Sequence, residues 1–285
     1  MGYTREFFIQ INDMNFSVLL SIYFKENPEY LTQSLDSVFQ QSLPPNEVVL
    51  VKDGPLTPAL DFIIDEYLNR YPILKVIPLT ENKGLGIALN IGLTHCSNNL
   101  VARMDTDDIA QPSRFEQQVQ QFKLNPELDV IGSWIDEFSG NKDNILSIRK
   151  VPETHKEIYA FAKKRNPVNH PSVMFKKEAV IAAGGYQHFP LFEDYYLWVR
   201  MLKQGFKFYN IQESLLYFRT SPDTFQRRGG KEYLKNENKL HSIFYQMGFI
   251  SFSRYMANMI VRSLVRLMPN KFRSYLYNRF VRNKK

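Results

Sequence analysis

Cysteine and long apolar runs are nearly absent from this chain of 285 residues. A single cysteine, Cys96, cannot form a disulfide within the chain, which fits a reducing compartment. No stretch approaches the roughly 20 consecutive apolar residues that span a bilayer, and the first fifteen residues lack the apolar segment of a signal peptide. Because 44% of the residues are hydrophobic and 23% are charged, we expect a globular, cytoplasmic protein with a substantial core.

Acidic residues are scarce at one end of the chain. Residues 227–285 contain fourteen of the 36 Lys and Arg residues but only two of the 29 acids, which gives this segment a net charge of +12. The remaining residues carry −5, so the overall charge of +7 hides an acidic body and a basic tail. We therefore expect an anionic partner surface to meet the tail.

Apolar runs of strand length alternate with helical spacings through the first half of the chain. This alternation predicts right-handed crossovers and an α/β fold with a doubly wound, mainly parallel sheet. Ligands of such sheets bind beyond the carboxyl ends of the strands. The predicted strands span 16–23, 47–52, 74–79, 100–104, 130–138, 145–151, 173–175, 206–211 and 215–219.

Three carboxylates within four residues follow the fourth predicted strand. Asp105, Asp107 and Asp108 precede a helix that is predicted to start near Pro112. This much like charge is unfavourable unless a cation offsets it, and Mg²⁺ or Mn²⁺ prefers oxygen ligands. The turn indicates either a metal site for a diphosphate or an acidic cap on the helix. Because Asp105 and Asp107 alternate, we assign them to the metal and Asp108 to the cap.

Two short polar motifs follow other predicted strands. Asp53 is a candidate ligand for a ribose or a base, or else part of a simple Asp-Gly turn. The segment 82–86 resembles the start of a dinucleotide-binding loop, but Leu89 stands where its third glycine would fall, which argues against a nicotinamide cofactor. Lys83 is either a nucleotide contact or a solvated lysine.

The second half of the chain offers further candidates for chemistry. His170 is either a third metal ligand or a structural histidine. Glu193 and Asp194 begin a predicted helix, where the dipole favours carboxylates and where one of them is placed to act as a general base. Arg227 and Arg228 form a basic loop that either closes over a diphosphate or is solvated.

The segment after residue 251 combines basic and apolar residues. Arg254, Asn258, Arg262 and Arg266 recur every fourth residue and form a polar stripe within a wider apolar surface. A similar mixture follows Pro269. We expect an interfacial helix pair on an anionic membrane surface. Packing on the body of the protein, or a dimer contact, is the alternative.

In the order and spacing of these motifs the chain resembles family 2 glycosyltransferases of the GT-A fold, which build bacterial surface polysaccharides. The resemblance covers about residues 16–230. It implies a GT-A domain over 1–230, with a nucleotide-binding half at about 16–110 and an acceptor and catalytic half at about 111–230. A basic amphipathic helical tail follows over 231–285. The motifs that carry the resemblance are 17–26, 51–54, 82–85, 88–90, 103–108, 169–171, 184–186 and 193–194.

The resemblance also implies roles for individual residues. Asp107 is the direct ligand of Mn²⁺ or Mg²⁺, and Asp105 lies nearer the ribose. Asp194 is the catalytic base, with Glu193 as the alternative. The acceptor lies at the turn of Gly184, Gly185 and Tyr186. The nucleotide sugar is bound by Ser21, Tyr23, Glu26, Asp53, Asn82, Lys83, Asp105, Arg227 and Arg228.

The implied reaction is an inverting, metal-dependent hexosyl transfer from a nucleotide-diphosphate sugar, UDP-glucose or UDP-galactose. The implied acceptor is a hydroxyl of a growing lipopolysaccharide or exopolysaccharide repeat unit on polyprenyl diphosphate, at the inner face of the plasma membrane. A non-catalytic nucleotide- or carbohydrate-binding protein is one alternative. A nucleic-acid-binding protein is the other, but no nucleic-acid module surrounds the tail and the body is acidic, so we expect no nucleic-acid partner.

Overall fold

One mixed sheet organises the computed structural model, which describes residues 14–220 and 230–267. The strand order is β3-β2-β1-β4-β8-β6-β9-β5, and β7 pairs with β6 outside this path. The first four strands of that order are mutually parallel, as expected for a doubly wound sheet. The strands are β1 Phe16–Ile22, β2 Glu47–Lys52, β3 Leu74–Pro78, β4 Leu100–Arg103, β5 Ile109–Ala110, β6 Val130–Ser139, β7 Asn141–Arg149, β8 Met174–Lys176 and β9 Phe208–Arg219.

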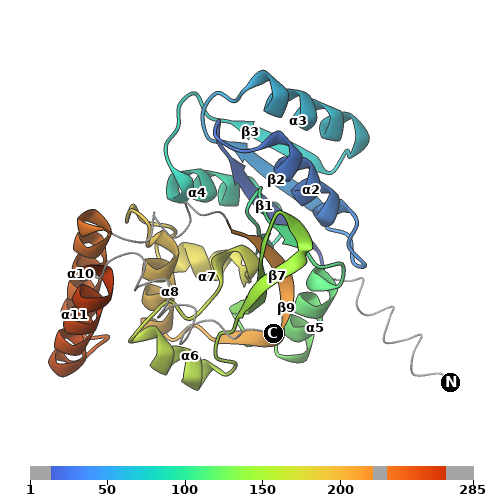
Figure 1. Cartoon of the computed structure of the whole chain (residues 1–285). Coiled ribbons are helices and arrows are strands. Elements are labelled where there is room, and N and C mark those ends of the chain that lie inside the picture. Colours follow the sequence, from blue (N-terminus) through green and yellow to red (C-terminus); the bar gives the residue numbers. More distant parts are fainter. Residues whose placement is uncertain (1–13, 221–229, 268–285) are drawn as a thin grey trace.

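Helices cover both faces of the sheet (Figure 1). Side-chain alternation along β1 shows the two layers: Leu19 belongs to the core under α4, α7 and α8, whereas Val18 and Leu20 belong to the core under α2, α3 and α5. The helices are α2 Pro28–Phe39, α3 Pro58–Arg70, α4 Leu85–His95, α5 Arg114–Leu124, α6 His155–Ala162, α7 Lys177–Ala182, α8 Glu193–Lys203, α10 Lys231–Gln246 and α11 Phe252–Leu267, with a 3-10 turn, η1, at His170–Ser172.

The structure corrects two details of the predicted strands. The segments expected at 206–211 and 215–219 form one strand, β9, because Ser214 still pairs with Trp134 across an irregularity in the β6–β9 register. The short strand β5 was not predicted, since it has only two residues. It pairs antiparallel with β9, which ties the acidic turn to the second half of the chain.

The helices α10 and α11 lie together along one side of the body (Figure 1). Leu240 and Phe244 of α10 belong to the same hydrophobic core as α8. The polar stripe predicted for α11 faces inward: Asn258 donates to the Lys163 carbonyl at 2.8 Å, and Arg262 pairs with Glu237 at 2.7 Å. The expectation that this stripe meets a headgroup layer was therefore wrong for these two residues, which anchor α11 to the body. The side chain of Arg266 lies outside the described residues.

Among residues 14–220 and 230–267, no helix is both long and apolar enough to cross a bilayer. The domain boundary expected at residue 230 stays a prediction.

Candidate active site

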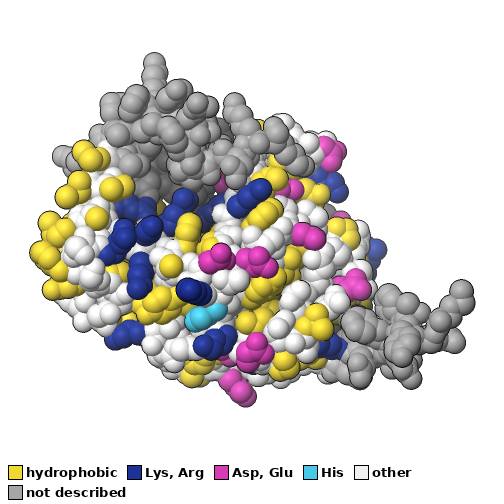
Figure 2. Space-filling model, turned by 90° about the horizontal axis from the view of Figure 1, so that it is seen from below, with side chains coloured by type: hydrophobic (Ala, Val, Ile, Leu, Met, Phe, Trp, Pro, Cys, Tyr) yellow, Lys and Arg dark blue, Asp and Glu magenta, His cyan; other side chains and the backbone are white. Residues whose placement is uncertain are grey.

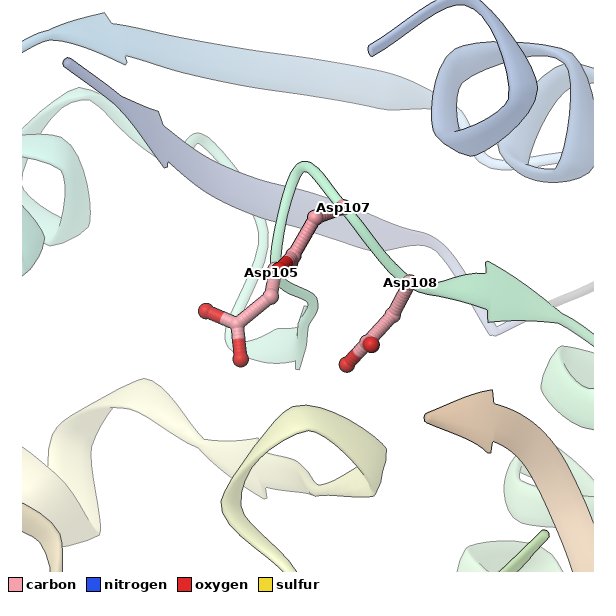
Figure 3. Close-up of side chains that lie close together, drawn as sticks. All are labelled: Asp105, Asp107 and Asp108. Carbon is pink, nitrogen blue, oxygen red and sulfur yellow. The ribbon is translucent and has the colours of Figure 1, made fainter. Parts of the chain in front are cut away.

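The acidic turn lies between β4 and β5, at the carboxyl edge of the parallel strands. Figure 3 shows Asp105 and Asp108 extending from the two arms of the turn, with Asp107 between them near its tip. One ligand-type oxygen of each carboxylate lies within 4.8 Å of the others. These oxygens are close enough to bind one cation together, and carboxylate oxygens are the ligands that Mg²⁺ and Mn²⁺ prefer.

The electrostatics of the turn also favour a cation. Burial, together with the charge of Asp105, raises the pKa of Asp107 to about 6. Burial and the charges of Asp107 and Asp105 raise the pKa of Asp108 well above its usual value. Asp108 Oδ2 is buried and has no hydrogen-bond partner among the described residues. A divalent cation at this point would relieve both the like-charge repulsion and the unpaired oxygen.

Asp108 does not cap the following helix, contrary to the sequence-based expectation. The helix α5 starts at Arg114 with Ser113 as the N-cap residue. Asp108 Oδ1 instead accepts from the backbone N–H of Arg219 at 2.9 Å, and the Arg219 side chain donates to the Asp107 carbonyl at 2.8 Å. Arg219 at the end of β9 therefore holds the acidic turn through these two hydrogen bonds, one to the Asp108 side chain and one to the Asp107 backbone.

Two buried arginines support the turn from the sheet side. Arg103, only 1% exposed, makes a two-pronged contact with the carboxylate of Asp105. Arg114 is fully buried and donates to the Arg103 carbonyl at 2.6 Å. Sequence analysis missed both arginines. The available signal was a charged residue at the end of an otherwise apolar strand, directly before an acidic turn.

Asp53 fastens the loop that leads into α4. Its two carboxylate oxygens accept from the backbone N–H groups of Lys83 at 2.7 Å and Gly84 at 3.0 Å, and the Asn82 amide donates to its carbonyl at 3.2 Å. Gly54 is required beside it, because its φ is +88° and an added Cβ would lie 2.7 Å from the Asn82 nitrogen. Asp53 thus shapes the loop, and direct nucleotide contacts by Asp53, Asn82 and Lys83 stay predictions.

Three other predicted nucleotide residues, Ser21, Tyr23 and Glu26, lie at or just after the end of β1. Thr106 Oγ1 lies 3.5 Å from the Ser21 carbonyl, which places the end of β1 beside the acidic turn. Tyr23 and Glu26 are half-buried, and the Glu26 N–H donates to the Tyr23 carbonyl at 3.1 Å. Their roles stay predictions. Arg227 and Arg228 lie outside the described residues.

The predicted acceptor turn is clamped by two side chains from different helices. Asn90 of α4 accepts from the Tyr186 N–H at 2.8 Å and donates to the Tyr186 carbonyl at 2.6 Å. Arg200 of α8 donates to the Gly185 carbonyl at 2.6 Å. Gly185 has φ +61°, and an added Cβ would lie 2.7 Å from Asn90 Oδ1. Gly184 precedes it at φ +87°.

His170 contacts this turn rather than the acidic cluster. His170 Nε2 lies 2.9 Å from the Tyr186 hydroxyl, and the ring packs against Trp198. Burial and the nearby Arg103 lower the pKa of His170 well below its usual value, so the imidazole is neutral. Among the described residues, Asp108 completes the carboxylate cluster. The assignment of His170 as a metal ligand stays a prediction.

Glu193 and Asp194 occupy the first turn of α8 and differ in their surroundings. Asn166 donates to Asp194 Oδ2 at 2.6 Å. Burial raises the pKa of Asp194, while the Tyr195 N–H, Asn166 and the charges of Arg149 and Arg103 oppose the rise. Burial raises the pKa of Glu193 to about 7, and the charge of Asp194 adds to the rise.

Arg103 connects the acidic turn with the start of α8. Its charge influences the pKa values of Asp107, His170, Tyr186 and Asp194. Arg103 contacts Asp105 of the carboxylate cluster, and its charge also acts on the acceptor turn and on Asp194. This arrangement provides a place for a cation and a diphosphate on one side and a proton acceptor on the other.

Comparison with known sequences identifies the family of this chain. Residues 17–182 match the profile of the family described as "Glycosyl transferase family 2". The chain is 40% identical over 267 residues to an Escherichia coli protein named UDP-Gal:alpha-D-GlcNAc-diphosphoundecaprenol beta-1,3-galactosyltransferase, covering 94% of this chain and 96% of that protein. It is also 40% identical over 267 residues to the amylovoran biosynthesis glycosyltransferase AmsE of Erwinia amylovora, covering 93% of this chain and 98% of AmsE.

Solved structures share the fold at lower identity. S. aureus TarS 1–349 in complex with UDP-GlcNAc superposes with a TM-score of 0.62 at 17% identity, covering 94% of this chain and 73% of that chain. The mannosyltransferase PcManGT from Pyrobaculum calidifontis, in complex with GDP-Man and Mn²⁺, superposes with a TM-score of 0.58 at 15% identity, covering 94% and 86%.

Proposed function

Because this chain belongs to glycosyl transferase family 2, we propose that it is an inverting galactosyltransferase that uses UDP-galactose. The proposed acceptor is the 3-hydroxyl of an N-acetylglucosamine carried on polyprenyl diphosphate, an early intermediate of a surface polysaccharide. The observation that carries this proposal is the 40% identity, over nearly the full length of both chains, to a protein named for that reaction.

The acidic turn is the proposed donor site. Asp105 is already engaged by Arg103, so Asp107 and Asp108 have the carboxylate oxygens best placed for Mn²⁺ or Mg²⁺, with Asp105 beside them. When bound, the cation would offset negative charge on the departing diphosphate. Asp107 and Asp108 would be fixed for this role by Arg219, which bonds to both residues from the far side of the turn.

Asp194 is the proposed general base. The charges of Arg149 and Arg103 lower the pKa of Asp194, and the charge of Asp194 raises the pKa of Tyr186 in the acceptor turn. In the proposed reaction the acceptor oxygen bonds to the anomeric carbon as the bond from that carbon to the UDP oxygen breaks. The acceptor proton passes to Asp194, and UDP leaves with the bonding electron pair. Asn166 orients the carboxylate through the bond to Oδ2.

A turnover screen tests the proposed reaction. UDP-galactose, UDP-glucose and UDP-GlcNAc are each supplied with Mn²⁺ and an alkyl-linked GlcNAc diphosphate, and the products are analysed by mass spectrometry and NMR. We expect galactose transfer with a β-1,3 linkage. Transfer of another sugar, or UDP binding without transfer to any acceptor, would contradict the proposal; the latter is the result expected of a non-catalytic binding protein.

We further propose that α11 docks on an anionic membrane surface, where a lipid-linked acceptor is found. With its polar stripe turned inward, α11 presents an apolar row outward: Phe252, Met256, Ile260 and Leu264 recur every fourth residue and are 41–61% exposed. Lys163 and Lys164 flank the helix, since their carbonyls accept from α11. On the side where α11 lies, Figure 2 shows Lys and Arg side chains beside hydrophobic ones. Apolar residues flanked by cations suit an anionic bilayer.

Vesicle sedimentation tests the membrane proposal. We expect the full chain to bind phosphatidylglycerol-containing vesicles more tightly than phosphatidylcholine vesicles, and Ile260→Asp to abolish binding. Phe62→Asp is the matched control, because Phe62 of α3 is 63% exposed and lies outside the docking surface. Wild-type binding to oligonucleotides but not vesicles would contradict the proposal, as would a dimer that Ile260→Asp dissociates while vesicle binding is unchanged.

A further inference from the structure

Arg149, the last residue of β7, is a half-buried cation that bonds to no anion within the part of the chain that the structure describes. Among the described residues, its guanidinium makes no hydrogen bond or ion pair. Other buried arginines are engaged: Arg103 with Asp105, Arg200 with backbone carbonyls and Arg219 with Gln33. None of its side-chain nitrogens is among the fully buried atoms that lack a partner, so solvent reaches its donors and a ligand with acceptor oxygens can replace that water. Arg149 is therefore a candidate for binding an anionic ligand.

A backbone contact places Arg149 next to the loop that also contacts the proposed base. Its carbonyl accepts from the Asn169 amide at 3.3 Å, and the same loop carries Asn166, which bonds to Asp194 at 2.6 Å. His170 in this loop contacts Tyr186 of the acceptor turn. The loop at 166–170 thus joins the end of β7, the base and the acceptor turn. The positive charge of Arg149 is also close enough to oppose the rise in the pKa of Asp194.

The proposed acceptor brings an anion to this place. Its diphosphate is attached to C1 of the same sugar ring whose 3-hydroxyl must reach Asp194, so the two groups are separated only by part of one ring. A planar guanidinium matches pairs of phosphate oxygens and remains charged at any physiological pH. We propose that Arg149 binds the acceptor diphosphate and thereby selects diphosphate-linked sugars. This inference rests on the proposed function.

Acceptor kinetics test this role. Two acceptors are compared at saturating UDP-galactose and Mn²⁺: undecyl-linked α-GlcNAc diphosphate and undecyl α-GlcNAc without the diphosphate. For Arg149→Ala we expect KM for the diphosphate acceptor to rise roughly 10- to 100-fold, as for loss of a charge-assisted hydrogen bond. The KM for UDP-galactose should stay within twofold of wild type, and so should the turnover of the uncharged acceptor at alkaline pH, where Asp194 remains deprotonated even without the charge of Arg149. Arg149→Lys should restore part of the acceptor affinity.

The control variant is Lys150→Ala, the neighbouring exposed cation whose Nζ lies 4.5 Å from the centre of the Trp134 ring. It should leave both acceptors unaffected. Thermal unfolding and UDP binding of Arg149→Ala verify that the fold is intact. Equal losses on the two acceptors, an unchanged KM for the diphosphate acceptor, or a raised KM for UDP-galactose would overturn the inference; the last result would place the donor diphosphate at Arg149. If the wild type transfers to neither acceptor, the proposed function itself fails.

Discussion

The two acidic pairs of the site, Asp107 with Asp108 and Glu193 with Asp194, are stabilised by different means. Both pairs are partly or fully buried and both have raised pKa values. At the acidic turn, buried arginines hold the neighbouring carboxylate and the backbone, and one carboxylate oxygen remains unpaired. At the start of α8, backbone N–H groups and the amide of Asn166 provide the contacts.

Because of this difference, the acidic turn is suited to hold a permanent charge such as a metal ion, and the start of α8 is suited to accept and release a proton. A rigid carboxylate cluster braced by cations remains suited to a metal ion and changes little during a reaction. A carboxylate held by neutral donors can accept a proton without leaving a buried cation unpaired. Substitutions at each pair, or at the residues that support it, should separate these two roles.

Asp194→Asn should reduce kcat by roughly 10²- to 10⁴-fold, because it removes the proton acceptor while keeping the size of the side chain. Calorimetric binding of UDP with Mn²⁺ should remain close to wild type. Glu193→Gln is the matched variant and should lose less than tenfold. If the two losses are reversed, Glu193 is the base.

Asp107→Asn should weaken UDP binding in the presence of Mn²⁺ to the level measured with EDTA, and should lower turnover roughly 100-fold or more, since a bound metal supplies several kcal/mol. Asp143→Asn on the exposed part of β7 is the control. Metal-dependent UDP binding that survives in Asp107→Asn would remove this residue from the metal site.

Arg103→Met should destabilise the fold by about 2–4 kcal/mol in urea titrations and should also reduce turnover. Breaking a buried ion pair costs about 3–5 kcal/mol, and the 31% exposure of the Asp105 side chain lowers that cost. Arg103→Lys should recover stability in part, because lysine keeps the positive charge but cannot make the two-pronged contact with the Asp105 carboxylate. A free energy of unfolding equal to that of wild type would show that Arg103 does not brace the turn.

Asn166→Ala should move the acidic limb of the pH–rate profile to higher pH, by up to about one unit. The hydrogen bond from Asn166 lowers the pKa of Asp194. Because the base must be deprotonated to act, loss of this bond should leave the enzyme inactive up to a higher pH. Asn144→Ala, which removes an amide in β7, is the control. An unchanged profile would contradict Asp194 as the titrating group.

Glu193→Gln should alter the pH dependence of stability by about 1–3 kcal/mol. The pKa of Glu193 is about 7 in the folded protein and 4.5 without the fold, so the folded state binds the proton more tightly. Wild-type stability should therefore fall as pH rises from about 4.5 to 7, and the glutamine variant should lack that part of the fall. Identical pH dependence of the two unfolding free energies would refute the raised pKa.

Sequence patterns predicted most strands of the sheet and the acidic turn because these features are local. Period and apolar runs located β1, β2 and β4, and the topology of parallel strands predicted that the polar residues at their ends lie along one edge. The supporting residues could not be found in this way. Asn90 contacts Tyr186 across 96 positions, and Asn166 contacts Asp194 across 28.

The tail shows a different limit. The four-residue period of polar positions in α11 was read correctly, but its direction was not, because periodicity does not say which face of a helix packs inward. Asn258 and Arg262 face inward because Lys163, Lys164 and Glu237 offer acceptors there. These acceptors lie far from α11 in the sequence or on another helix, so the match between them and the polar stripe can be recognised only in the folded structure.

The contact of Asn90 with Tyr186 limits how members of this family can exchange parts. Asn90 belongs to the half expected to bind the nucleotide, and Tyr186 to the half expected to bind the acceptor. A chimera that joins the first half of one relative to the second half of another inherits both sides of this bond from different parents. Recombination that changes donor and acceptor independently must therefore preserve an amide at position 90 and a glycine at position 185.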